Sequence, residues 1–260
     1  MKNMKKAVSI VLMLAMCLSL VACGNGAAEE ETVDISSQEL LVFSGAGLAN
    51  PVQEIADAFE AETGCKPQIV FAATGQLISQ IQTSESGDIL IAGAKDELAA
   101  MTEDEMVETV EMVKHIPVIA VKAGNPLGID SFADLAAEDV TIVFPDPETT
   151  PMGKIAMKVF EEAGIKDRID VVANTTTAPL AMTALAEDQA DAAVLWKENV
   201  ATNDKVEALE LPEMEKYVKV VPAVSLSYSE NNEAREAFLE FMTSDAGMEI
   251  WAKHGYEAVE

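Results

Sequence analysis

Short apolar runs alternate with stretches of helical periodicity along most of the chain. The run Leu40–Phe43 is typical of a buried strand. After it, apolar residues recur at spacings of three and four, which places them on one helical face: Val52, Ile55, Ala56 and Phe59. The same succession repeats to the C-terminus. It predicts an α/β fold with largely parallel sheets.

The later elements suggest two α/β series. Further strands are expected at residues 66–72, 87–93, 115–121, 141–144, 170–173, 192–196 and 219–226, with helical segments between them and two more at 233–243 and 244–253. The apolar strands 116–121 and 219–226 are candidate crossings between two lobes. We therefore expect residues 38–115 plus 222–260 to form the first lobe and residues 116–221 to form the second.

The turn after the first strand, Ser44–Gly47, consists of small residues that let a ligand approach the backbone closely. A helix start follows, with Asn50 as the expected N-cap, Pro51 at the first helical position and Gln53 placed to complete a capping box. Free N–H groups and the helix dipole make such a start an anion site. An ordinary βα corner would show the same pattern, so this stretch alone does not distinguish an anion site from a corner without a ligand.

A second copy of the arrangement lies at Val70–Leu77, where Thr74 and Gly75 occupy the turn. Each copy consists of a strand, a small or hydroxylated turn, a glycine, a leucine and a helix. Two such turns side by side would direct two helix N-termini at one crevice, as expected at the carboxyl ends of strands in an open α/β sheet. The pair therefore indicates a binding crevice.

The composition restricts the partners of such a crevice. With 45 acidic and 17 basic residues, the formal net charge is −28 at pH 7. A chain this acidic is not expected to bind nucleic acid and should be repelled by anionic lipid surfaces. It also repels free anions at long range. Any bound anion must therefore be held by local donors in an enclosed site.

The N-terminus has the features of a targeting segment. Three lysines within the first six residues precede the apolar run Val8–Val21, which is too short for a comfortable membrane span. The small residues before Cys23 resemble a bacterial lipoprotein signal, so residues 1–22 should be removed, Cys23 lipidated and residues 23–37 left as a flexible tether. The alternative is a plain secretory signal with an incidental cysteine. We expect the protein on the outer face of the bacterial cytoplasmic membrane, attached only through its lipid.

Catalytic and metal-binding patterns are absent from the sequence. Beyond the signal and Cys23, the only cysteine is Cys65, which can form neither an internal disulfide nor a cysteine metal site, and which we expect in a surface turn or half-buried. His115 and His254 belong to no spaced metal cluster, and each is expected to be a packing or surface residue. No nucleophile has a base nearby. We expect no cofactor and no enzyme, although a secreted transferase with the same fold is an alternative.

Four segments carry a resemblance to a known family: residues 42–48, residues 71–77 with 87–91, the pattern Asp146-Pro147-Glu148-x-x-Pro151-x-Gly153, and residues 191–196. In this order and spacing they resemble the substrate-binding lipoproteins of molybdate/tungstate ABC transporters, over nearly all of residues 38–260. The resemblance implies a two-lobed periplasmic-binding-protein fold of type II with a ligand cleft between the lobes. It implies a monomeric receptor that closes over a tetrahedral oxyanion and delivers it to a membrane permease.

The resemblance also implies a set of ligand-binding residues, with departures from the family pattern: Ser44, Gly45, Gly47, Thr74, Gly75, Met152, Ala178 and Trp196. The hydroxylated residue of the family's first turn falls on Gly47, which offers only its main-chain N–H. Thr74 can still donate from the second turn, and main-chain donors fall on Met152 and near Ala178. The family's tyrosine falls on Trp196, which keeps an indole N–H donor.

The residue types around this set favour an anion without a proton. Neither first-lobe turn contains Arg or Lys, and Lys154 is the only nearby cation in the second lobe. A donor-rich, nearly neutral site suits a fully ionised dianion such as molybdate or tungstate. Phosphate keeps a proton at neutral pH and needs an acceptor, for which only Asp146 and Glu198 are close enough in sequence. Receptors for sulfate, phosphate or a small organic acid that stacks on Trp196 are the alternatives.

Overall fold

The computed structural model describes residues 34–259. The predicted signal segment 1–22 and the predicted lipid site at Cys23 lie outside these residues, as does most of the tether. Within them, no helix is both long and apolar enough to cross a membrane.

The first of two sheets takes four strands from residues 39–115 and two from the C-terminal part of the chain. Its strand order is β11 (Glu257–Ala258), β4 (Met106–His115), β10 (Lys219–Leu226), β3 (Ile89–Ile91), β1 (Glu39–Gly45) and β2 (Lys66–Ala72). Strand β1 runs parallel to β2 and β3, whereas β10 is antiparallel to β3 and β4. Short 3-10 turns lie beside it at Ala46–Leu48, Lys95–Ala100 and Glu103–Glu105.

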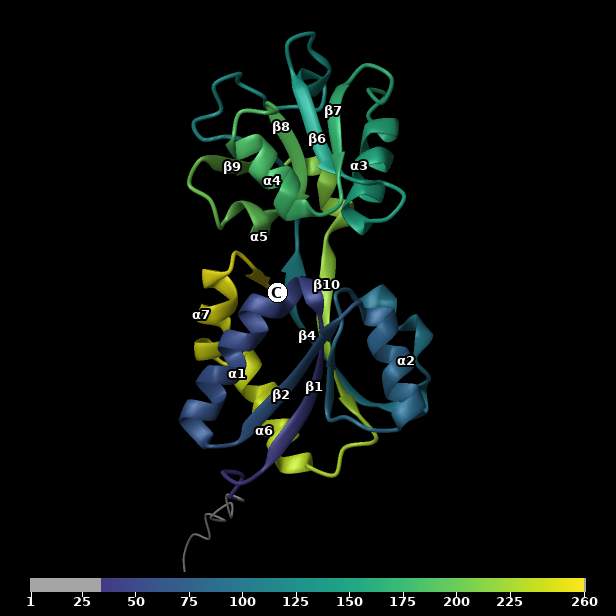
Figure 1. Cartoon of the computed structure of the whole chain (residues 1–260), viewed down its shortest axis with the longest axis vertical. Helices are drawn as coiled ribbons and strands as arrows, with labels where there is room; N and C mark the ends of the chain where they lie inside the picture. Colours follow the sequence, from purple (N-terminus) through teal and green to yellow (C-terminus); the bar gives the residue numbers. More distant parts are fainter. Residues whose placement is uncertain (1–33, 260) are drawn as a thin grey trace, which may run out of the picture. The chain divides into compact units, whose positions relative to one another are not determined.

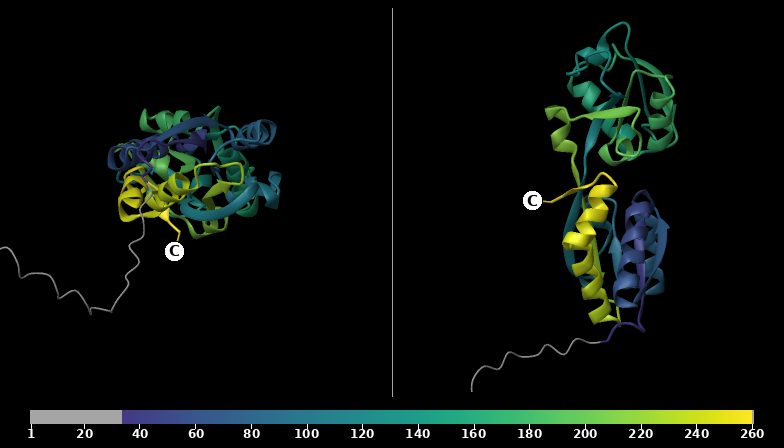
Figure 2. Two further views of the ribbon diagram at one scale, coloured as in Figure 1. Left: turned by 90° about the horizontal axis from the view of Figure 1, so that it is seen from below. Right: turned by 90° about the vertical axis from the view of Figure 1, so that its left-hand side faces the viewer.

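Helices cover both faces of this sheet. Helix α2 (Thr74–Ser84) packs on one face, and α1 (Ala49–Thr63), α6 (Asn232–Thr243) and α7 (Asp245–Lys253) pack on the other (Figure 1). Figure 2 shows the C-terminal helices beside α1, where the rings of Phe59 and Phe238 lie 5.0 Å apart edge to face. Cys65 is wholly buried in this core, contrary to the prediction of a surface or half-buried position, and burial raises the pKa of its thiol.

The second sheet is built from the middle of the chain. Its strand order is β7 (Asp170–Thr175), β6 (Thr141–Pro145), β8 (Ala192–Trp196), β5 (Pro117–Lys122) and β9 (Val206–Leu209). Helix α3 (Pro151–Glu162) covers one face and α4 (Ala178–Ala186) the other (Figure 1). The remaining short elements are α5 (Lys197–Val200) and the 3-10 turns Asp134–Ala136 and Pro212–Tyr217.

Both sheets are mixed, so the expectation of largely parallel sheets was wrong in this respect. Strand β6 is parallel to β7 and β8, but β5 is antiparallel to β8 and β9. The apolar stretch 115–121 is not one strand, because β4 ends at His115 in the first sheet and β5 begins at Pro117 in the second. Ile116 therefore joins the two sheets. The chain returns to the first sheet where β10 begins at Lys219.

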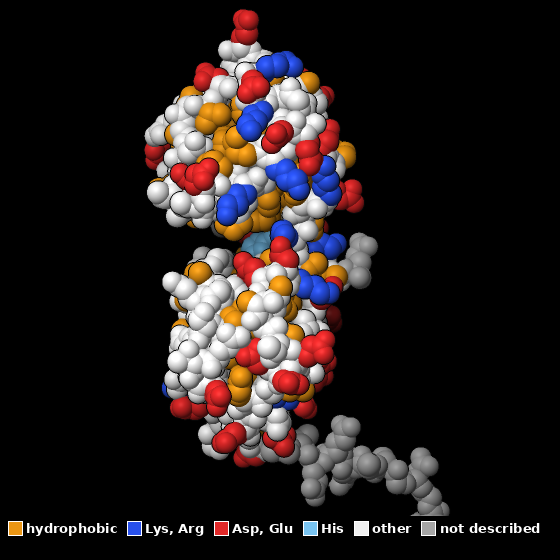
Figure 3. Space-filling model, turned by 90° about the vertical axis from the view of Figure 1, so that its right-hand side faces the viewer, with side chains coloured by type: hydrophobic (Ala, Val, Ile, Leu, Met, Phe, Trp, Pro, Cys, Tyr) orange, Lys and Arg blue, Asp and Glu red, His pale blue; other side chains and the backbone are white. Residues whose placement is uncertain are grey.

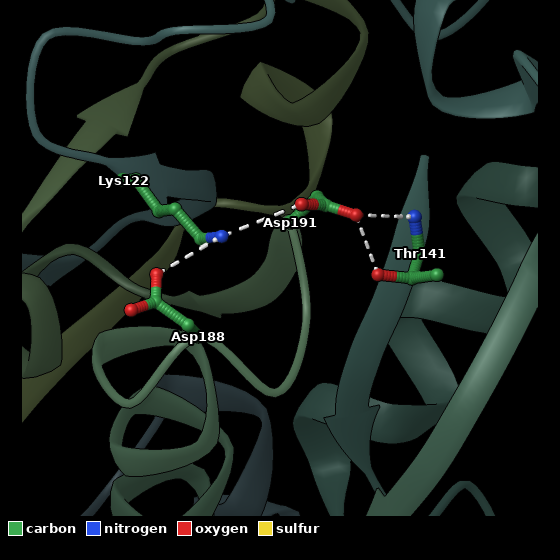
Figure 4. Close-up of polar contacts among 4 residues, drawn as sticks. All are labelled: Lys122, Thr141, Asp188 and Asp191. Atoms are coloured by element: carbon green, nitrogen blue, oxygen red, sulfur yellow. Dashed lines mark hydrogen bonds and ion pairs between the residues drawn. The ribbon is translucent and has the colours of Figure 1, made fainter. Parts of the chain in front are cut away.

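A carboxylate ties together the ends of three strands in the second sheet (Figure 4). Oδ2 of Asp191, just before β8, accepts hydrogen bonds from the main-chain N of Thr141 at 3.0 Å and from its hydroxyl at 2.6 Å. Oδ1 lies 3.4 Å from Nζ of Lys122, which also contacts the exposed Asp188 at 3.1 Å. Burial alone would raise the pKa of Asp191, but the hydrogen bonds from Thr141 and the charge of Lys122 outweigh it and hold that pKa below its usual value.

Candidate functional site: a cleft at the helix N-termini

A cavity of about 740 Å³ is lined by elements attached to both sheets. This volume falls within the range of small-molecule binding sites. Figure 3 shows a hollow of the surface at mid-height of the molecule, with Lys and Arg side chains (blue) gathered to its right. The first sheet contributes the turn after β1, the turn after β3, the end of β4 and the start of β10. The second sheet contributes the end of β6, the starts of α3 and α4, the end of β8 and α5.

Three helix N-termini open onto the cavity and bring four of the eight predicted site residues together. Gly47, Met152, Ala178 and Trp196 all line it. The Met152 side chain belongs to the core of the second lobe, so the donor it can offer is its main-chain N–H in the first turn of α3. Ala178 is the first residue of α4, and its N–H is likewise free of an intrahelical acceptor. The cavity thus receives main-chain donors from both lobes.

The other four predicted residues, Ser44, Gly45, Thr74 and Gly75, do not line the cavity. Ser44 is wholly buried, and its hydroxyl reaches only the Gly45 carbonyl, at 3.5 Å. Thr74 is also buried, and its Oγ1 accepts a hydrogen bond from the main-chain N of Gly93 at 3.2 Å. Gly75 lies exposed in the first turn of α2. In this structure these residues shape the turns and do not face the cavity.

The first helix begins differently from its predicted start. The 3-10 turn Ala46–Leu48 leads directly into α1, whose N-cap is Leu48 without a side-chain cap. Asn50 is therefore not an N-cap, and its side-chain amide makes no capping hydrogen bond to the start of α1. It is exposed and lines the cavity, where it adds a side-chain donor that the sequence pattern assigned elsewhere.

The start of α3 is held tightly against the end of β6. Thr150 caps the helix by accepting a hydrogen bond from the main-chain N of Gly153 at 3.0 Å, as its sequence position before Pro151 predicts. A Cβ on Gly153 would lie 2.3 Å from the Pro145 carbonyl oxygen and 2.5 Å from that of Asp146. Only glycine lets the helix approach this closely. This contact sets the position of the Met152 amide.

Two buried side chains in the cavity wall form a pair that was not predicted from the sequence. His115 at the end of β4 and Glu198 in α5 are both buried, and His115 Nδ1 lies 2.6 Å from Glu198 Oε1. The imidazole packs between Trp196, at a centroid distance of 5.0 Å, and Tyr256, at 5.3 Å. Both His115 and Glu198 line the cavity. Their separation of 83 residues leaves no local signal in the sequence.

The remaining charges at the cavity are largely paired. Lys219 Nζ lies 2.6 Å from Asp96 Oδ2, and Glu97 accepts a hydrogen bond from the main-chain N of Ala94 at 3.2 Å. Lys154 makes no ion pair with any described residue. Residues 34–259 contain no group of three or more His, Cys, Asp or Glu that could hold a metal ion. Asp146 does not line the cavity, because its carboxylate accepts hydrogen bonds from its own loop.

Residues 40–257 match the family model described as bacterial extracellular solute-binding protein. The chain belongs to this family. A Haemophilus influenzae protein described only as a binding protein is 30% identical over 229 residues, which cover 86% of this chain and 93% of that protein. The molybdate-binding protein ModA of Mycobacterium bovis is 23% identical over 243 residues, 91% of this chain and 92% of its own length.

The fold is similar to that of a solved structure. A substrate-binding domain attributed to a molybdenum ABC transporter of Clostridium difficile superimposes with a TM-score of 0.76 at 22% identity, covering 86% of this chain and all of that one. The prediction of a two-lobed periplasmic-binding-protein fold is therefore confirmed. This solute-binding protein accordingly functions on the extracytoplasmic side of the membrane.

Proposed function

We propose that this protein is the receptor of an ABC transporter for a tetrahedral oxyanion, molybdate or tungstate. The observation that carries the proposal is the convergence of three helix N-termini, with main-chain donors at Gly47, Met152 and Ala178, on one cavity. Free amides and helix dipoles together favour an anion at such a point. The name of the Mycobacterium bovis relative, a molybdate-binding protein, supports the choice of anion.

Closure of the lobes completes the proposed site. Four oxygens, each given the volume of one water, fill only about 120 Å³, far less than the cavity volume of about 740 Å³. An oxyanion can touch donors from both lobes only if the lobes approach each other. The two connections between the sheets, at Ile116 and before Lys219, are the points about which they would turn.

Calorimetric titration tests the proposal directly. We expect saturable one-to-one binding of molybdate and tungstate, with sulfate and phosphate bound at least about tenfold more weakly. Saturable binding of none of the four anions would refute it.

One substitution removes a single proposed donor at little structural cost. Ala178→Pro deletes the first N–H of α4, at a position where proline fits because that N–H has no intrahelical acceptor. Losing a hydrogen bond to a charged ligand should weaken molybdate binding about 10- to 100-fold with an unchanged melting temperature. Wild-type affinity in the folded variant would remove Ala178 from the site.

A second candidate is a receptor for a small organic acid. The unfilled volume and the half-buried Trp196 in the cavity wall favour it, because an indole face can pack against an apolar or planar part of a ligand. The same titration with small dicarboxylates and organic phosphates distinguishes the two. Binding of one of these acids, with no response to molybdate or tungstate, would establish the second candidate in place of the first.

The proposed attachment follows from the sequence outside the described residues. We propose that Cys23 carries lipid, that residues 1–22 are removed, and that the receptor delivers its anion as a monomer to a membrane permease. Radiolabelled palmitate incorporation by the wild type and its loss in Cys23→Ser would test the anchor.

A further inference from the structure

We propose that His115 is a proton-coupled ligand contact: it takes up a proton when the cavity receives an oxyanion and donates Nε2–H to it, while Glu198 acts as its positioning residue. This inference rests on the proposed function. The proton comes from the solvent, and the bound state gains one positive charge beside the incoming negative ones. No covalent bond changes.

The geometry around the imidazole leaves one nitrogen available. A carboxylate can only accept, so Nδ1 is the nitrogen that donates to Glu198 across the 2.6 Å contact. Nε2 makes no hydrogen bond with any described residue, and it is not among the side-chain atoms sealed from solvent. His115 itself lines the cavity. Nε2 is therefore free to meet a ligand.

Glu198 is not itself the ligand contact. Its second oxygen, Oε2, has no hydrogen-bond partner and is sealed from solvent, so it cannot reach a molecule in the cavity. A carboxylate held 2.6 Å from Nδ1 lies where it can compensate the positive charge that the ring gains when a proton arrives with the ligand. The carboxylate also fixes which ring nitrogen faces the cavity. This explains why a receptor for anions keeps an acidic side chain in its wall.

The other charged groups near His115 largely cancel. Lys219 lies opposite His115 in the β10–β4 register, but its ammonium contacts Asp96 at 2.6 Å. Lys197, next to Glu198 in α5, contacts Glu210 and Glu257. Burial and then the charge of Glu198 raise the pKa of Tyr256, so this phenol stays neutral. Lys114, the neighbour of His115 on β4, borders a different hollow.

A protonated His115 matters because the cavity offers few other cations. Among the lining residues, Lys219 is already paired and only Lys154 is without an ion pair among the described residues. A doubly charged anion brings two negative charges into an enclosed space. Protonation on binding supplies compensation only when the ligand is present, and it disfavours ligands too weakly charged to draw the proton.

The test measures proton uptake in the unmodified protein. Titration with molybdate between about pH 7 and pH 8.5, above the ordinary histidine pKa of about 6.5, in buffers of different ionisation enthalpy should show uptake approaching one proton. Affinity should fall by up to about tenfold per pH unit. His115→Gln should weaken binding about 10- to 100-fold at the lower pH and abolish the pH dependence. Glu198→Gln should keep the contact but move the fall in affinity to lower pH.

The chain offers a matched control in its second described histidine. His254 Nε2 also contacts a glutamate, Glu54 Oε2 at 2.8 Å, but neither residue lines the cavity. His254→Gln should therefore keep the wild-type affinity and proton uptake. Molybdate binding without proton uptake in the wild type would overturn the inference and leave the proposed function intact. If neither molybdate nor any of the other three anions binds, both are overturned.

Discussion

Replacing Gly153 by alanine should destabilise the protein by about 3 kcal/mol and cause the largest loss of anion affinity of any single-methyl change. The new Cβ would lie 2.3 Å and 2.5 Å from two main-chain carbonyl oxygens, and backbone atoms cannot turn aside as a flexible side chain can. Helix α3 must then withdraw from β6, and its withdrawal carries the Met152 amide away from the cavity. Chemical denaturation and molybdate titration of the same preparation would measure both effects.

Gly75 provides the control for this substitution. It also lies in the first turn of a helix, but a Cβ there would meet no atom within 4 Å. Gly75→Ala should leave stability unchanged or raise it by up to about 1 kcal/mol, because alanine favours the helix. Equal stability of the two variants would contradict the close approach of α3 to β6.

Replacing Asp191 by asparagine should cost about 1.5–3 kcal/mol of unfolding free energy at neutral pH, the usual contribution of hydrogen bonds to a charged acceptor. The amide oxygen can still accept both hydrogen bonds from Thr141, but only as a neutral acceptor, and its NH₂ group would face the ammonium of Lys122. Urea denaturation at pH 7 would measure the loss. Asp188→Asn is the matched control, because that exposed ion pair with Lys122 should contribute about 0.5 kcal/mol or less.

The effect of Asp191 should also depend on pH in a defined direction. Its pKa is lower in the folded protein than in the unfolded chain. Its contribution is therefore present above the ordinary aspartate pKa of about 3.9 and is lost as the pH falls through the lower folded value. The difference between wild type and Asp191→Asn should shrink in acid. A difference that stayed constant from pH 7 to about pH 3 would show that the carboxylate charge is not what stabilises this corner.

Much of the fold could be predicted because its local patterns agree with the final structure. Apolar runs marked strands such as β1, and helical spacing marked helices such as α1. Of strand β4, only the last residue, His115, was predicted to be in a strand. The rest was missed because several of its residues are polar and exposed. No local pattern specifies that a chain turns from one sheet to another at a single residue, Ile116. Sheet direction was misjudged for the same reason.

The candidate site was predictable where it uses main-chain groups and less so where it uses side chains. Gly47, Met152 and Ala178 line the cavity, as helix starts that the resemblance already marked as main-chain donors. Ser44 and Thr74 also stand in turns, but their side chains point into the structure, and no periodicity reports that direction. The pairing of His115 with Glu198 joins the end of β4 in the first sheet to α5, which follows β8 of the second, so only the folded chain reveals it.

The most direct test of the proposed oxyanion site is the anomalous diffraction of crystals grown with tungstate. We expect one strong tungsten peak in the cavity, with tungstate oxygens about 2.7–3.2 Å from the main-chain nitrogens of Gly47, Met152 and Ala178. A peak outside the cavity, or none at a tungstate concentration that saturates the protein in solution, would contradict the proposed site.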